Sequence, residues 1–401
     1  MDVDVVGVPA EYDEYREQLR SFIAANAPQL KTKRRNGHRA PEYAEDIDAL
    51  KRWIAALHAA GYQPAANRDL DAFKLRILRE EIAASGFPSV LGNSALLTAI
   101  ERFGTADQQR RYLPQIHSGQ HVLCQLFSEP EAGSDLASLR TRAVKKGDVY
   151  VVHGTKTWTS FGHWADYGLL LARTDPDAER HSGISAFIMS MRDPGVHVRP
   201  MRMCVGTSDF SEVVIDGAEV PAENLIGPEN DGWRIALGTL FGERTAIFAG
   251  GSDHAAGKAN TESGPRATVR ELFELAATTL SGGKPKLEES AWRYRLADLY
   301  AQASLQVYNS YRVMTRAALN TTTPADAPVS KIIGSELNLK IAETALGLLG
   351  AESLLVEGDP LAHRDGHWQD WFLYARALMI GGGTLEVMRN IIAERALGLP
   401  K

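Results

Sequence analysis

The apolar residues of this chain change their spacing twice. Up to about residue 120 they recur at helical intervals, as in residues 11–26. Between 121 and 229 they form short or alternating runs separated by turn residues, which is typical of strands in an antiparallel domain. Long Ala-, Leu- and Arg-rich stretches follow. The order predicts an α+β fold with an N-terminal helical domain (1–120), a middle antiparallel β domain (121–229) and a C-terminal helical bundle (230–401).

The individual segments follow from the same patterns. Two further N-terminal helices are centred on residues 47–57 and 75–82. Strands are expected at 148–154, 167–173, 184–191, 196–201 and 211–217. Bundle helices are expected at 231–250, 266–280, 287–320, 329–355 and 366–397, with Gly-rich loops at 254–266 and 281–286.

Composition excludes several classes of protein. The 401 residues carry a formal net charge of −6, so no basic surplus points to nucleic acid or to an anionic membrane. The basic segment 31–40 fits a solvated turn better than a phosphate site. The chain shows neither a signal-peptide start nor an apolar run of membrane-spanning length, so we expect a cytoplasmic protein without membrane insertion. The two cysteines, Cys124 and Cys204, are expected as free core thiols.

Several common site motifs are absent from the sequence. Neither GxGxxG nor GxxxxGK[ST] occurs, which argues against a Rossmann or P-loop nucleotide site. His363 and His367 are four residues apart, but Asp365-Gly366 is a turn signal that breaks the helix such a metal pair needs. No metal site is predicted.

Three segments are better candidates. Residues 124–135, CQLFSEPEAGSD, place a sharp turn after an apolar strand, and residues 154–160, GTKTWTS, set Trp158 among hydroxyls. Residues 380–389, IGGGTLEVMR, bring bare backbone to a helix start, which favours an anion or oxyanion. Taken singly, these segments also have ordinary interpretations as a surface turn, a core aromatic and an interhelix loop.

With these segments in this order, the sequence resembles the acyl-CoA dehydrogenase family. The resemblance also includes GTADQQRRYLPQI (104–116) and FSEVVIDGAEVPAENLIG (210–227), so it extends over most of the chain. It implies helical, β and four-helix-bundle domains in the order already predicted, a middle domain of two packed sheets, bound FAD and a tetramer. The implied activity is an oxidoreductase of lipid catabolism that converts an acyl-CoA to the trans-2-enoyl-CoA and passes electrons to an electron-transfer flavoprotein.

The resemblance assigns roles to individual residues. Phe127 and Ser128 match contacts to the isoalloxazine ring, and Ser134 matches a serine beside flavin and thioester. Trp158 and Ser160 match the pair that flanks the reactive flavin edge. The family positions near the adenine and ribityl parts of FAD are matched by Thr384 and Glu386.

The family reaction needs a base to remove the α proton. An α C–H is too weak an acid for a carboxylate in water, so the site must desolvate this base and hydrogen-bond the thioester oxygen. Many members carry this base as a Glu before the Gly-Thr of the C-terminal motif, a position that is Gly382 here. Another branch places it on the first C-terminal helix, directly before an Arg. That pattern assigns Glu243 as base and Arg244 as its substrate-side neighbour, and leaves the Gly382 N–H to polarise the thioester carbonyl.

The chain also departs from the family pattern. The segments that grip the FAD diphosphate across a subunit boundary are replaced by TLSGGKP (279–285) and GLLGAE (347–352), which lack the usual Arg, Phe and Gln. The usual N-terminal stretch near the acyl pocket is replaced by residues 61–75. Two alternatives therefore stay open: a non-catalytic subunit that completes a partner's FAD site in a hetero-oligomer, and an oxidase or tailoring enzyme acting on a carrier-bound acyl chain.

Overall fold

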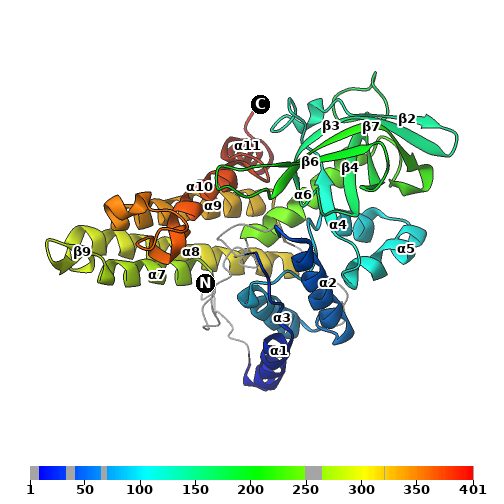
Figure 1. The fold of residues 1–401 in the computed structure, drawn as a ribbon. Helices are drawn as coiled ribbons and strands as arrows, with labels where there is room; N and C mark the ends of the chain where they lie inside the picture. The colour runs from blue at the N-terminus through cyan, green and yellow to red at the C-terminus, as the bar shows by residue number, and fades with distance from the viewer. Residues whose placement is uncertain (1–8, 33–40, 65–69, 249–263, 320, 401) are drawn as a thin grey trace.

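The computed structural model describes residues 9–32, 41–64, 70–248, 264–319 and 321–400, without the side chains of residues 72, 241–248, 314, 317 and 318. Figure 1 shows a group of helices, a β-sheet domain and an elongated set of helices, in this chain order. The predicted fold class is confirmed. Most of the predicted loops at 31–40 and 254–266 lies outside the described residues.

In its described residues the N-terminal domain has five α-helices, the first three around one apolar core and the last two in a second core that they share with the β domain. They are α1 (Asp13–Asn26), α2 (Ala44–Ala59), α3 (Ala72–Ser85), α4 (Ala95–Phe103) and α5 (Ala106–His117). Local chemistry fixes their starts: the Asp71 carboxylate accepts hydrogen bonds from two backbone N–H groups of α3, and Thr105 forms a capping box with Gln108 on α5. The core between α1, α2 and α3 includes Leu19, Trp53 and Leu78.

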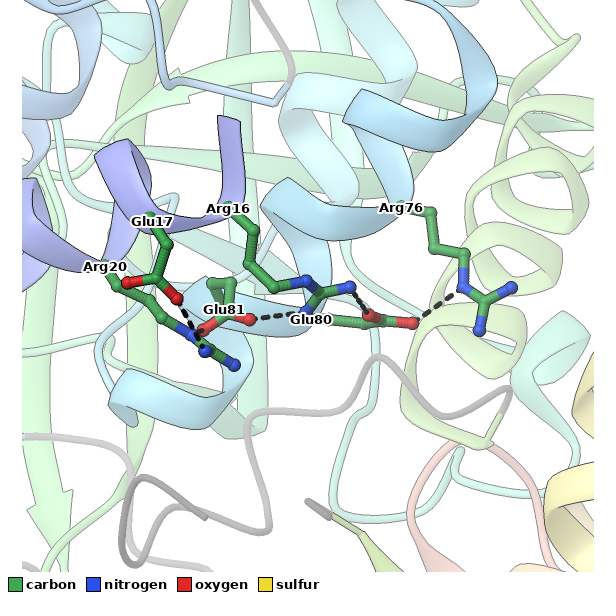
Figure 2. Close-up of polar contacts among 6 residues, drawn as sticks. All are labelled: Arg16, Glu17, Arg20, Arg76, Glu80 and Glu81. Atoms are coloured by element: carbon green, nitrogen blue, oxygen red, sulfur yellow. Dashed lines mark hydrogen bonds and ion pairs between the residues drawn. The ribbon is translucent and has the colours of Figure 1, made fainter. Parts of the chain in front are cut away.

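An ion-pair network holds α1 on α3 (Figure 2). Arg16 contacts Glu80 at 3.0 Å and Glu81 at 2.5 Å, and Arg20 contacts the other oxygen of Glu81 at 2.9 Å. Arg76 binds the second oxygen of Glu80 at 2.7 Å. Glu81 is only 8% exposed, so it is the buried member of this network.

The middle domain contains eight strands. They are β1 (Leu123–Leu126), β2 (Arg142–Lys146), β3 (Val149–Ser160), β4 (Tyr167–Arg173), β5 (Ile184–Ser190), β6 (Val196–Met201), β7 (Phe210–Pro221) and β8 (Leu225–Ile226). Hydrogen bonds connect them in the order β6-β7-β3-β2-β4-β5-β8, with β1 beside β4. The five predicted strands are present as β3 to β7, the apolar strand predicted within residues 124–135 is β1, and β2 and β8 are additional.

The sheet has two halves that meet at one residue pair, Arg142 opposite Arg173. Tyr150 and Val213 from one half and Leu170 and Phe187 from the other belong to one buried core cluster. The domain is therefore close to the two packed sheets that the resemblance implied. Most pairings are antiparallel, but β1 and β2 each run parallel to β4. Parallel neighbours cannot be joined by a tight turn, and β3 lies between both of these strands and β4 in the chain.

In the C-terminal domain, helices pack around α9. The helices are α6 (Gly232–Phe248), α7 (Pro265–Thr278), α8 (Ser290–Ala318), α9 (Asp326–Leu349), α10 (His367–Ile380) and α11 (Leu385–Ile391). Helix α9 contacts the other five. The predicted loop at 281–286 includes part of a small hairpin, β9 (Leu280–Ser281) with β10 (Lys284–Pro285). The stretch predicted as helical at 366–397 divides into α10 and α11, in line with the helix start predicted after the triple glycine, and Gly382 and Gly383 at the break have φ of +71° and +100°.

Three smaller predictions can also be compared with the structure. Cys124 is a buried free thiol as expected, but Cys204 is exposed because it lies in the turn after β6, so its assignment to the core was wrong. The HRDGH segment does break: Arg364 and Asp365 both have left-handed φ values. No helix in the described ranges is long and apolar enough to span a membrane.

Candidate active site

The segment that follows β1 makes a tight turn. β1 is buried beside β4, and Phe127, at its end, is 5% exposed. Glu129 and Ala132 exchange backbone hydrogen bonds of 3.0 and 3.1 Å, which closes a turn directly before the one that the sequence predicted at residues 133–135. Beyond it, Ser134 is exposed, and Asp135 accepts hydrogen bonds of 2.7 Å from Arg180.

Strand β3 brings Trp158 next to this turn. The Thr157 N–H donates to the carbonyl oxygen of Ser128 at 2.9 Å, so the two predicted segments are in direct contact. The pairing of β3 with β7 is irregular between Lys156 and Thr159, and within this bulge Trp158 has a φ of +57°. This conformation costs an aromatic residue about 1–3 kcal/mol and needs surrounding structure to hold it.

The bulge turns Trp158 outward. Its side chain is 57% exposed, and its ring contacts Phe210 edge-on at 5.8 Å between centroids. Ser160, two residues on, is half-buried opposite Phe210 in the β7 ladder. A large indole at the surface offers a flat face for another ring or chain.

A buried ion pair lies beneath these residues. Lys156 is fully buried, and its Nζ donates to Glu129 Oε1 at 2.8 Å and to the Phe127 carbonyl at 3.1 Å. Burial lowers the pKa of Lys156 to about 8. Burial acts to raise the pKa of Glu129, but the Lys156 charge and hydrogen bonds outweigh it and hold that pKa below its usual value. The sequence analysis did not predict this pair, although the first motif carries acidic residues and the second carries a lysine.

The third segment lies at the start of α11. Thr384 caps this helix, its hydroxyl accepting from the Val387 N–H at 3.3 Å, and Glu386 is exposed in the first turn. Hydrogen bonding by backbone N–H at the helix start, then by Thr384, lowers the pKa of Glu386. On the other side of the glycines, the Leu378 carbonyl accepts a 2.9 Å hydrogen bond from Ser335 of α9. The turn containing Gly382 is thus bounded by two fixed helix ends.

The predicted residues therefore fall into three sets. Phe127, Ser128, Trp158 and Ser160 belong to two segments of the β domain that hydrogen-bond to each other, with Ser134 on the adjoining loop. Thr384 and Glu386, beside Gly382, belong to the C-terminal turn. The backbone of α6 includes Glu243 and Arg244, but their side chains lie outside the described part of the chain.

Two polar atoms bear on whether a cofactor fits at the β-domain edge. Gln125 Nε2 and Thr159 Oγ1 are buried and have no hydrogen-bond partner among the described residues. Both lie on the strands that carry Phe127 and Trp158. Buried donors and acceptors usually have hydrogen-bond partners. A bound ring with polar atoms at its edge would supply the missing partners, so these two atoms fit a cofactor at this place. In the described residues no group of three or more metal-ligating side chains is assembled.

Comparison with known proteins gives a consistent result along the chain. Family models of the acyl-CoA dehydrogenase N-terminal, middle and C-terminal domains match residues 9–120, 124–218 and 230–397. The acyl-CoA dehydrogenase IpdE1 of Mycobacterium tuberculosis is 32% identical over 98% of both chains. A chain of the ChsE4-ChsE5 complex from the same organism is 30% identical, with a TM-score of 0.79 and full coverage of both chains. A chain of the Tcur3481-Tcur3483 steroid ACAD is 28% identical, with a TM-score of 0.80 and full coverage.

Proposed function

The chain belongs to the acyl-CoA dehydrogenase family, and we propose that it removes the α and β hydrogens of an acyl-CoA thioester with FAD as its cofactor. That it is an oxidoreductase acting on acyl-CoA follows from the family. The observation that carries the FAD assignment is the junction of residues 127–129 with 156–158, which presents Trp158 above a buried polar edge.

FAD supplies the acceptor for the hydride that leaves the β carbon. The chain's own residues would hold it. Phe127, Ser128, Trp158 and Ser160 would contact the isoalloxazine ring, with Ser134 reaching toward ring and thioester. Thr384 and Glu386 would contact the adenine and ribityl parts. A rigid edge suits this purpose, because preorganised groups do not have to reorient during the reaction.

Proton removal is assigned to Glu243 of α6. A carboxylate removes an α proton only where water is excluded and the enolate oxygen is stabilised. The Gly382 N–H is proposed as the donor to the thioester oxygen. Its φ of +71° and the open space around its α carbon allow a substrate to approach the backbone closely there. Arg244 is proposed as the neighbour that contacts the substrate.

The relatives support a narrower proposal on substrate and assembly. Because one similar structure is a steroid ACAD and another is a complex of two different chains, we propose a steroid-linked acyl-CoA and a hetero-oligomer, with an electron-transfer flavoprotein as electron acceptor. The hairpin β9–β10, which replaces one family diphosphate grip, is largely exposed and carries Lys284 but no Arg. This departure supports an FAD site shared with a different partner chain.

The test is anaerobic flavin reduction by a panel of straight-chain, branched and steroid acyl-CoAs. We expect the visible band of oxidised flavin to bleach in wild type and to bleach about 10³-fold more slowly in Glu243→Gln. Glu274→Gln, on the exposed side of α7, is the matched control and should bleach like wild type.

Two other outcomes would favour the alternatives. Bound flavin that no acyl-CoA reduces would support the non-catalytic subunit, whose basis is the changed diphosphate segments. Rapid reoxidation of reduced flavin by O2 would support an oxidase instead of a dehydrogenase coupled to a flavoprotein. Either result would contradict the proposed reaction with its electron acceptor.

A further inference from the structure

Three separate stretches of chain meet at the Lys156–Glu129 pair. The ammonium of Lys156 binds the Glu129 carboxylate and the Phe127 carbonyl. The same carboxylate accepts hydrogen bonds from the backbone N–H groups of Arg140 at 2.7 Å and Thr141 at 2.9 Å. The pair therefore ties the turn after β1 to β3 and to the residues that lead into β2.

A gain in folding stability does not by itself explain why a buried ion pair is present here. Taking two charges out of water is costly, and well-packed apolar residues in their place often give a protein of equal or greater stability. What the pair provides is geometry: each oxygen and nitrogen is directed to a specific backbone group. Those groups are the Phe127 carbonyl, just before the turn, and the Arg140 and Thr141 N–H groups, which lead into β2.

The location of the pair gives this geometry a consequence for the site. Lys156 lies two residues before Trp158, and the Thr157 N–H between them donates to Ser128. Trp158 adopts a left-handed backbone conformation that the surroundings must enforce. Any slip of the turn relative to β3 would move Phe127, Ser128 and Trp158 relative to one another.

We propose that Lys156 and Glu129 are positioning residues that lock residues 127–129 to β3 and so set the spacing of Phe127, Ser128 and Trp158, which form the proposed ring-binding edge. This inference rests on the proposed function for what the edge binds, and it extends that function to residues that do not themselves contact the ring. A displacement of about 1 Å at such an edge is enough to weaken binding and reaction substantially.

The chain offers a closely matched control. Glu81 is also a glutamate that is 8% exposed, and it is also ion-paired, to Arg16 and Arg20 (Figure 2). It belongs to α3 and not to the β domain. Glu129→Gln and Glu81→Gln therefore remove the same charge from equally buried, paired sites, and only the first acts on the proposed edge.

The experiment compares these full-chain variants by amide hydrogen exchange without added flavin and by FAD titration. We expect Glu129→Gln to speed exchange in residues 127–134 and 156–161 and to raise the Kd for FAD about tenfold, with a changed visible flavin spectrum. Glu81→Gln should leave exchange in those peptides unchanged and the Kd within about twofold of wild type. The double variant Lys156→Met with Glu129→Gln removes both charges, so it should regain stability relative to Lys156→Met but not FAD affinity.

The two proposals fail in different ways. Equal exchange and equal FAD affinity in Glu129→Gln and Glu81→Gln would overturn the positioning role while the proposed function stands. Recovery of FAD affinity together with stability in the double variant would also overturn it, because the effect would then be one of stability. A wild type that binds no FAD even when its partner chain is supplied, with faster exchange confined to Glu129→Gln, would refute the FAD assignment and support the lock.

Discussion

At the residue scale, Asp326 is another buried carboxylate whose role can be separated from catalysis. It is 1% exposed and accepts hydrogen bonds from Arg312 and Arg316 at 2.9 Å and from the Thr323 N–H at 2.7 Å. Burial acts to raise its pKa, but these bonds prevail, and the pKa of Asp326 is lowered. The charged form is therefore favoured in the folded protein.

The sign of the pH effect follows. A carboxyl whose pKa is lower in the folded state contributes stability above its unfolded pKa of about 3.9, and this contribution is lost as the pH falls through the folded value. We expect Asp326→Asn to reduce the free energy of unfolding at neutral pH by about 2 kcal/mol, with the difference from wild type shrinking in acid. Urea unfolding across pH measures this. The surface variant Asp107→Asn should follow wild type, and a constant difference for Asp326→Asn at all pH values would contradict the assignment.

At the scale of elements, β1 is positioned by a close backbone approach. Gly92, with φ of +87°, bridges to Leu123, and a β carbon on it would lie 1.9 Å from the Leu123 carbonyl oxygen. Gly61 has a similar φ of +74° but open space around it. Substitution of Gly61 would therefore introduce backbone strain alone, whereas substitution of Gly92 would introduce backbone strain and a steric clash.

We expect Gly61→Ala to cost about 1 kcal/mol from the left-handed backbone alone. Gly92→Ala adds a backbone clash and should cost about 3 kcal/mol. Because β1 leads directly into Phe127, Gly92→Ala should also speed hydrogen exchange across residues 123–128. Thermal and chemical unfolding give the comparison, and equal losses in the two variants would show that the approach of residue 92 to β1 is not tight.

The elements also show how far the sequence could be interpreted. Periodicity identified the long strands, the three-part order and most long helices, because burial of one face repeats along each of them. The break at Gly381–Gly383 was predicted from the triple-glycine motif and not from periodicity. Periodicity did not identify β8, which has two residues, since such short pairings depend on tertiary context. Cys204 was misplaced for the same reason.

The site divides along similar lines. The resemblance assigned the segment 124–135 and Trp158 to one flavin, and the hydrogen bond from Thr157 to Ser128 shows that these two segments are in contact. The Lys156–Glu129 pair depends on a contact between residues 27 positions apart, which no local pattern encodes. The roles of all the assigned site residues, in the β domain as well as in the C-terminal domain, remain predictions that rest on the resemblance.

At the scale of the whole molecule, the segment between α9 and α10 is unusually apolar for a surface. Leu354, Val356 and Leu361 are 81%, 60% and 75% exposed. Exposed apolar groups of this kind mark surfaces that another chain covers. They lie on the C-terminal domain next to GLLGAE, the segment at which the family would grip FAD across a subunit boundary.

We therefore expect Leu354→Ser combined with Leu361→Ser to shift the full chain toward a lower mass in sedimentation velocity, with or without its partner chain. The far-UV circular dichroism and unfolding midpoint of the dissociated protein should stay close to wild type, because these side chains contribute little to the folded core. Val144→Ser, which removes a 54% exposed apolar side chain from β2, should leave the mass unchanged. An unchanged mass in the double variant would place the subunit contact elsewhere, and a shared FAD site would then have to be built from another face of the bundle.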